Sequence, residues 1–144
     1  MNTTATHAQP RMIDTGAARI EVISRGAGAL VILLPSLGRA AEDFDDLATR
    51  VAQAGYQVLT PQPRGLGTSV GPMQNITLHD YARDMAVVIN AYGGGPAVIG
   101  GHAFGNFVAR TTAADHPALV KAIMLIAALI PAIVPVWPRF HHRA

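Results

Sequence analysis

Short apolar runs alternate along the chain with segments whose apolar residues recur every three or four positions. The runs are rich in branched side chains and mostly border glycine or proline, which is typical of buried parallel strands. They span residues 30–34, 56–60, 97–99 and 122–127. Helical periodicity fills the intervening segments, over residues 41–53, 77–92 and 104–115. The pattern therefore predicts strands and helices in regular alternation.

The beginning of the chain has a different pattern. Residues 11–15 and 18–25 alternate in polarity around Gly16, which predicts a two-stranded hairpin. After this hairpin the predicted order is β-α-β-α-β-α-β. Such alternation implies right-handed crossovers and a mostly parallel sheet with helices on both faces. We therefore predict an α/β fold, a three-layer α-β-α sandwich.

Composition agrees with one globular domain. Half of the 144 residues are hydrophobic and only 14% are charged, so the chain can bury a core. We expect a disordered N-terminus over residues 1–10, a partial domain over 11–128 and an irregular tail, rich in proline and arginine, over 129–144. The chain has no cysteine, which excludes disulfides, thiolate catalysis and cysteine-bound metal.

Several classes of function find no support. The net charge is +2, and no basic run is interleaved with aromatic residues, so we expect no nucleic-acid binding. The most apolar stretch, residues 122–137, is interrupted by Pro131 and Pro135. It is therefore shorter than the ~18–20 apolar residues of a membrane helix. No secretory signal pattern is present in residues 1–10, and no spacing suggests a metal or a nucleotide cofactor. We expect a cytoplasmic protein without a cofactor.

The most informative segment is Gly101-His102-Ala103-Phe104-Gly105. It stands between a predicted strand and a predicted helix, which is the arrangement of a nucleophile elbow, G-x-S-x-G. The flanking glycines suit such a turn, because neighbouring backbone passes too close for a Cβ atom. The apex residue should be a nucleophile. Here it is Ala103, whose methyl group cannot attack a substrate.

Two other segments occur in the same context as in one known family. Residues 35–38 (Pro-Ser-Leu-Gly) follow the first parallel strand, and residues 61–69 (Pro-Gln-Pro-Arg-Gly-Leu-Gly-Thr-Ser) follow the next. Together with residues 101–105, they resemble the oxyanion loop, the Asp-x-Arg-Gly-x-Gly-x-Ser loop and the Gly-His-Ser-x-Gly elbow of α/β-hydrolase-fold proteins. The resemblance extends from Arg11 to about Ala128 and corresponds to the N-terminal half of that fold.

The chain also departs from the pattern of the family. Ala103 replaces the nucleophile, Gln62 replaces the acid of the arginine loop, and Pro35-Ser36 replace His-Gly. In the family the triad acid and the catalytic histidine come later in the chain. The pair His141-His142 comes too early for that histidine and is interpreted as part of the tail.

The resemblance implies roles for individual residues. The backbone N–H groups of Leu37 and Phe104 would be the oxyanion donors, able to bind a ligand oxygen even without a nucleophile. His102 would pack around the elbow, and Arg64 would brace its glycine loop. Ser36 lies in the oxyanion loop and can face the pocket, but no base is visible for it. Hydrolysis by a serine mechanism is therefore the least favoured activity.

Three hypotheses stay open. The chain is an α/β-hydrolase relative with an incomplete catalytic centre, a pseudoenzyme or a protein with unrecognised chemistry. Alternatively, it is a module that binds a small apolar or carbonyl-containing ligand or another protein. The third hypothesis is a truncated fragment of a longer hydrolase acting on ester or carbonyl substrates. In each case the predicted strand 122–127 would be a bare apolar sheet edge, which predicts a homo-oligomer formed through that edge.

Overall fold

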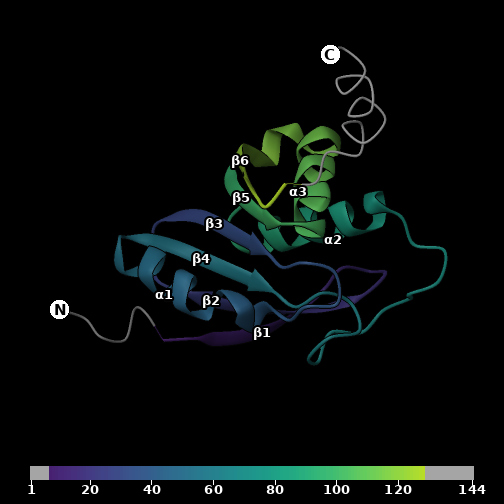
Figure 1. Cartoon of the computed structure of the whole chain (residues 1–144), viewed down its shortest axis with the longest axis horizontal. Helices are drawn as coiled ribbons and strands as arrows, with labels where there is room; N and C mark the ends of the chain where they lie inside the picture. Colours follow the sequence, from purple (N-terminus) through teal and green to yellow (C-terminus); the bar gives the residue numbers. More distant parts are fainter. Residues whose placement is uncertain (1–6, 129–144) are drawn as a thin grey trace, which may run out of the picture.

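The computed structural model describes residues 7–128, which fold around a six-stranded sheet (Figure 1). The strands are β1 (Gln9–Asp14), β2 (Arg19–Arg25), β3 (Ala29–Leu34), β4 (Tyr56–Pro61), β5 (Ala97–His102) and β6 (Val120–Ile126). The helices are η2 (Ala41–Phe44), α1 (Asp45–Gln53), α2 (Leu78–Ala91), α3 (Phe104–Asp115) and η3 (Pro117–Leu119).

The sheet confirms the predicted α/β class and its mostly parallel topology. Its strand order is β1-β2-β4-β3-β5-β6. The four strands β4, β3, β5 and β6 run parallel, whereas the hairpin of β1 and β2 joins them in antiparallel fashion. Because β3 and β5 lie side by side in the middle, the loops that follow them meet at one edge of the sheet.

Three of the differences between the observed and the predicted bounds bear on the fold. β1 begins at Gln9, which pairs with Ser24, so the first ten residues do not all precede the fold as predicted. The predicted helix over residues 41–53 is a 3₁₀ turn followed by α1. β5 extends through two glycines to His102, beyond the predicted end of this strand at residue 99. Hydropathy periodicity does not reveal this extension, because glycine has no side chain to contribute to the pattern. The predicted tail over residues 129–144 lies outside the described residues.

Alternating residues of β3 divide the core between the two faces of the sheet. Leu30, Ile32 and Leu34 pack toward α2 and α3, whereas Val31 and Leu33 pack toward η2 and α1. This is the two-residue period of a strand that is covered on both sides. Figure 1 shows α1 on one face and α2 and α3 on the other. The middle layer is therefore buried from both directions.

β6 differs from the other central strands because it is an edge strand of the described sheet. Its side chains Ile123, Met124 and Leu125 are 37%, 43% and 40% exposed. Successive residues of a strand point to opposite faces, so apolar surface is exposed on both sides of this edge. Within residues 7–128, no helix has the length and apolar character needed to cross a bilayer.

Candidate active site

The turn between β5 and α3 has the strained geometry of a nucleophile elbow. Ala103 has φ +49° and ψ −110° and immediately precedes α3. A positive φ is uncommon for a residue with a Cβ atom and costs about 1–3 kcal/mol. The Ala103 N–H donates to the carbonyl of Ile126 over 3.0 Å, and its carbonyl accepts from the N–H of Asn106 over 3.1 Å. The surrounding strand and helix therefore hold the turn in place.

The two glycines of the elbow are required by close packing. A Cβ atom on Gly101 would clash with the backbone of Gly105. A Cβ atom on Gly105 would clash with the carbonyl of Leu34 and lie 2.8 Å from that of Pro35. The start of α3 therefore approaches both its own strand and the end of β3 too closely for a side chain. This confirms the prediction that neighbouring backbone passes too close to these two positions for a Cβ atom.

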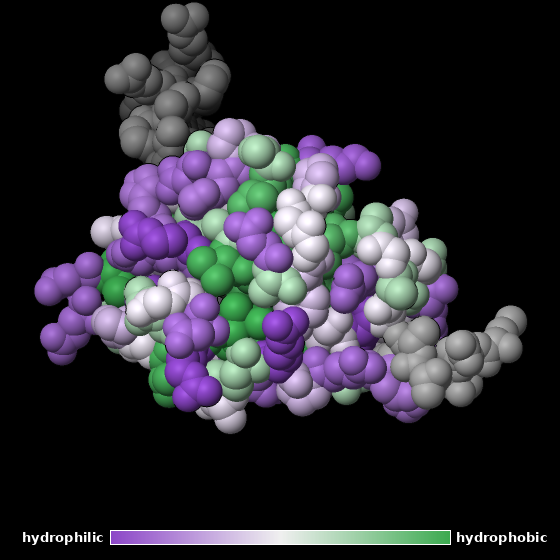
Figure 2. All heavy atoms as spheres, turned by 180° about the vertical axis from the view of Figure 1, so that it is seen from behind, coloured by the Kyte–Doolittle hydropathy of each residue, from purple (hydrophilic) through white to green (hydrophobic). Residues whose placement is uncertain are grey.

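A cavity of ≈ 400 Å³ opens beside the elbow. Its wall contains Ser36 and Leu37 from the loop after β3, and Phe104 and Gly105 from the start of α3. Apolar side chains cover most of the rest: Ile20, Leu34, Leu66, Met73, Met85 and Val108. Ala103 itself, which is half-buried, is not among the lining residues. Figure 2, which shows the molecule from behind the view of Figure 1, has apolar side chains gathered in the middle of the visible face, with mostly hydrophilic side chains around them.

Two backbone donors in this wall are unengaged. Within residues 7–128, neither the N–H of Leu37 nor that of Phe104 forms a hydrogen bond. Phe104 is the first residue of α3, so its N–H has no acceptor within the helix. The structure thus brings together in one cavity wall the two residues that the sequence singled out as oxyanion donors.

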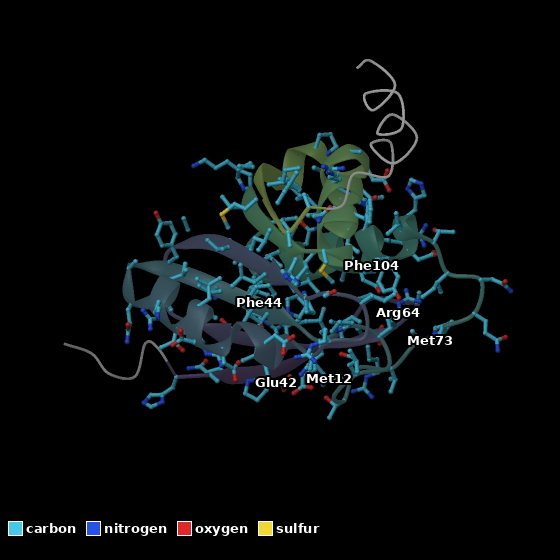
Figure 3. The ribbon with its side chains drawn as sticks, viewed as in Figure 1. Met12, Glu42, Phe44, Arg64, Met73 and Phe104 are labelled. Atoms are coloured by element: carbon cyan, nitrogen blue, oxygen red, sulfur yellow. The ribbon has the colours of Figure 1, made fainter. Side chains whose placement is uncertain are left out.

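The arginine loop, residues 61–69, forms another part of the cavity wall and is held in place by a buried ion pair. Arg64 Nε and Nη2 donate to the two carboxylate oxygens of Asp84 over 2.7 and 3.1 Å, and both side chains are almost fully buried. Arg64 Nη1 also donates to the carbonyl of Pro72 over 3.1 Å. The hydrogen bonds with Asp84 raise the pKa of Arg64. Arg64 therefore braces its loop, as predicted. Figure 3 shows it near Phe104 and Met73.

Gln62 takes a structural role at the position where the resemblance expects an acid. Its side-chain oxygen accepts from the N–H of Ala41 over 2.9 Å, and its side-chain nitrogen donates to Glu42 over 2.8 Å. Ser69 donates to the carbonyl of Gln62 over 3.0 Å. Gln62 is 2% exposed, so it ties the arginine loop to the start of η2.

The same combination of elbow, loops and sheet occurs in known proteins. The family model described as "alpha/beta hydrolase fold" matches residues 29–143. This chain belongs to the α/β-hydrolase fold family. Among its relatives, epoxide hydrolase A of Mycobacterium tuberculosis is 33% identical over 92% of this chain. The 2-(acetamidomethylene)succinate hydrolase of Mesorhizobium japonicum is 28% identical over 83% of it.

Solved structures support the same assignment. The structure of an epoxide hydrolase from an endophytic Streptomyces superposes with a TM-score of 0.73 and 28% identity, covering 82% of this chain and 36% of that one. This chain spans 43% of the length of each of the two curated relatives named above.

A second, smaller cavity of ≈ 150 Å³ in this α/β-hydrolase domain corrects one prediction. It is lined by Ser36, Asp43 and His102, together with Pro35 and Phe44. His102 is exposed, so it does not pack around the elbow as predicted. Its neighbours in this cavity include Asp43 and Phe44 of η2, which leave the imidazole exposed.

The serine, histidine and aspartate of this cavity do not form a catalytic triad. Both carboxylate oxygens of Asp43 accept from Arg39, over 2.7 and 2.9 Å. These bonds lower the pKa of Asp43. Within the described residues, no hydrogen bond joins His102 to Ser36 or to Asp43. The components are neighbours without the contacts that triad chemistry requires.

Sequence reasoning missed two residues of the main cavity, Asp84 and Tyr81. Both lie on α2, and Asp84 is buried on the face that packs against the sheet. The sequence does contain one signal for Asp84, because it is a charged residue among the periodic apolar positions of a helix. Buried charges are normally paired, so such a residue indicates a partner elsewhere in the fold. Its partner, Arg64, lies twenty residues earlier and could not be assigned from spacing alone.

Proposed function

We propose that this chain binds a small apolar molecule carrying a carbonyl or similar oxygen, and that it does not hydrolyse esters by a serine mechanism. The observation that carries the proposal is the cavity wall that contains Leu37 and Phe104 with unengaged N–H groups. Two such donors beside an apolar surface suit a ligand with one polar end.

The identity of residue 103 supports the second half of the proposal. Removing the serine of a triad costs a factor on the order of 10⁶ in turnover, and Ala103 has no oxygen or sulfur to attack with. Ser36 is the nearest substitute in the cavity wall, and it has no hydrogen bond to an imidazole within residues 7–128. The catalytic role expected at position 103 is therefore proposed to be lost while the binding site persists.

The strained turn adds an argument from energy. An elbow costs stability, and a protein that needed only a compact fold would gain by relaxing it. Here the turn is present around an inert methyl group. A role for the exposed backbone donors accounts for its presence.

The test is an assay of p-nitrophenyl acetate and p-nitrophenyl butyrate with the wild type and the Ala103→Ser variant. We expect no hydrolysis above the buffer rate by the wild type. Native mass spectrometry of the purified protein should show a bound small molecule. Wild-type hydrolysis abolished by Ser36→Ala or His102→Ala would contradict the proposal. An empty cavity in every preparation would argue against the binding function. Activity in Ala103→Ser alone would show that only the nucleophile is missing.

A second candidate function, association with another protein, is favoured by the exposed β6 edge. An edge strand offers unpaired N–H and C=O groups, and Ile123, Met124 and Leu125 expose apolar surface beside them. We propose a second copy of this chain as the occupant, because β6 can pair with itself antiparallel about a two-fold axis.

Sedimentation velocity over a range of concentrations tests this association. Leu125→Lys should abolish a concentration-dependent dimer. Leu47→Lys on α1 is the matched control, because Leu47 is 41% exposed and Leu125 40%. A monodisperse monomer at all concentrations would contradict the proposal.

The activity of the longer hydrolases does not transfer directly to this chain. The relatives are named as hydrolases of an epoxide and of an acetamidomethylene succinate, and both names fit an oxygen-bearing ligand. The cytoplasmic location stays a prediction.

A further inference from the structure

The polar side chains that line the main cavity fall into two groups. Gln62, Arg64 and Asp84 are engaged in the hydrogen bonds and the ion pair described above. The hydroxyl groups of Ser36 and Tyr81 form no hydrogen bond within residues 7–128, although both residues line the cavity. Among the described residues of the wall, these are the only two side chains that can bind a ligand oxygen without breaking an existing hydrogen bond.

The ring of Tyr81 is held in position. It meets the ring of Phe104 edge to face, with 5.9 Å between centroids and 81° between planes. The guanidinium carbon of Arg64 lies 6.0 Å from the centroid of the Tyr81 ring. Arg64 is held by Asp84, and Phe104 is the first residue after the elbow. The Tyr81 side chain is therefore already restricted, so a hydrogen bond from it to a ligand would cost little additional side-chain entropy.

Tyr81 also remains a neutral donor at ordinary pH. Burial of its ring raises the pKa of the phenol above its usual value. The residue is half-buried and packs against the main hydrophobic cluster. When a ligand displaces water from these surroundings, a hydroxyl that is left without a hydrogen bond costs free energy. A ligand that offers the Tyr81 hydroxyl an acceptor oxygen avoids this cost.

We propose that the Tyr81 hydroxyl donates a hydrogen bond to the oxygen of the ligand and selects oxygen-bearing molecules over hydrocarbons of the same shape. The proposal rests on the proposed binding function and adds a specificity-determining side chain from α2. The ligand class is then an apolar body with an acceptor oxygen near the ring of Phe104. Tyr81 is the side-chain counterpart of the two backbone donors.

Two probes with the same carbon skeleton separate this role from simple packing. 4-Phenylbutan-2-one carries a carbonyl oxygen, and butylbenzene has a similar shape without it. Dissociation constants for both are measured by NMR titration of the ¹⁵N-labelled chain, in the wild type and in Tyr81→Phe. We expect Tyr81→Phe to weaken binding of the ketone ~10-fold, the effect of one hydrogen bond, and to leave butylbenzene within about twofold.

Tyr56→Phe is the matched control. Tyr56 lies on β4, is 43% exposed and does not line the cavity, so this variant should bind both probes as the wild type does. Equal weakening of both probes by Tyr81→Phe would overturn the proposal and leave Tyr81 a packing role. Loss of ketone binding in Ser36→Ala with no change in Tyr81→Phe would also overturn it. If the wild type binds neither probe, the binding function itself is wrong, and this assignment with it.

Discussion

The starts of helices α2 and α3 are built in opposite ways. Before α2, Thr77 and Asp80 form a capping box in which the carboxylate of Asp80 accepts the N–H of Thr77 over 2.7 Å. Before α3, Ala103 has a positive φ and no side-chain cap, and the N–H of Phe104 is unengaged within the described residues. One helix start therefore has a side-chain cap that engages the N–H groups of Thr77 and Asp80. The other has no side-chain cap and lies in the wall of the main cavity.

This difference separates stability from function within one fold. A capped helix start satisfies orphan backbone groups and stabilises the helix. An uncapped, strained start is maintained only when the surrounding packing enforces it. The close approach of Gly101 and Gly105 to neighbouring backbone supplies that enforcement. We therefore infer the binding function at the start of α3, the helix start that lacks a stabilising side-chain cap.

The largest expected effect comes from breaking the enforced start of α3. In Gly105→Ala the new Cβ atom would clash with the carbonyl of Leu34. We expect a loss of about 3 kcal/mol in the free energy of unfolding, as for an overpacked core, measured by urea denaturation. Gly38→Ala is the control, because Gly38 has φ +71° and nothing within 4 Å of its Cβ position. It should lose only about 1 kcal/mol, and equal losses in both variants would show that packing does not enforce the elbow.

Local features of both helix starts could be predicted from the sequence. The glycines around Ala103 are predicted from their neighbours in the chain, and the structure confirms the close packing that requires them. The spacing of Thr77 and Asp80 is likewise typical of a capping box, which the structure contains. Contacts between distant segments could not be predicted in this way. The pairing of Arg64 with Asp84 and the packing of Tyr81 on Phe104 depend on how α2 meets two loops. The exposure of His102 depends likewise on how η2 lies beside the end of β5.

A smaller effect is expected from breaking the cap of α2. Thr77→Ala removes the hydroxyl that accepts the N–H of Asp80. Loss of a threonine cap costs about 1 kcal/mol, which thermal unfolding followed by circular dichroism would detect. Ligand binding at the start of α3 should be unchanged in this variant. A Thr77→Ala variant as stable as the wild type would remove the contrast between the two helix starts.

A substitution at the apex of the elbow is expected to change the free energy of unfolding by a still smaller amount and to increase it. Ala103→Gly removes the Cβ atom that makes φ +49° unfavourable. The gain is partly offset because glycine gains freedom in the unfolded chain, so we expect a stabilisation of about 0.5 kcal/mol. Chemical denaturation of the two proteins side by side measures it. Clear destabilisation would mean that the methyl group packs usefully and that the turn is not strained.

The smallest effect concerns pH and the cap of α2. Hydrogen bonds from the backbone and side chain of Thr77 lower the pKa of Asp80. A carboxyl whose folded pKa lies below its unfolded value stabilises the fold above the unfolded pKa. That contribution is lost as the pH falls through the folded pKa. The stability difference between the wild type and Asp80→Asn should therefore be present at pH 7 and shrink below about pH 4. A difference that is independent of pH would contradict the capping role of the carboxylate.

The central claim is that a ligand oxygen binds the unengaged donors beside an inert apex. The most direct measurement is the ¹⁵N–¹H spectrum of the chain during titration with 4-phenylbutan-2-one. The account predicts that the backbone amide signals of Leu37 and Phe104 shift together and saturably, while that of Thr77 stays in place. Saturable binding that leaves the signals of Leu37 and Phe104 unmoved would contradict it.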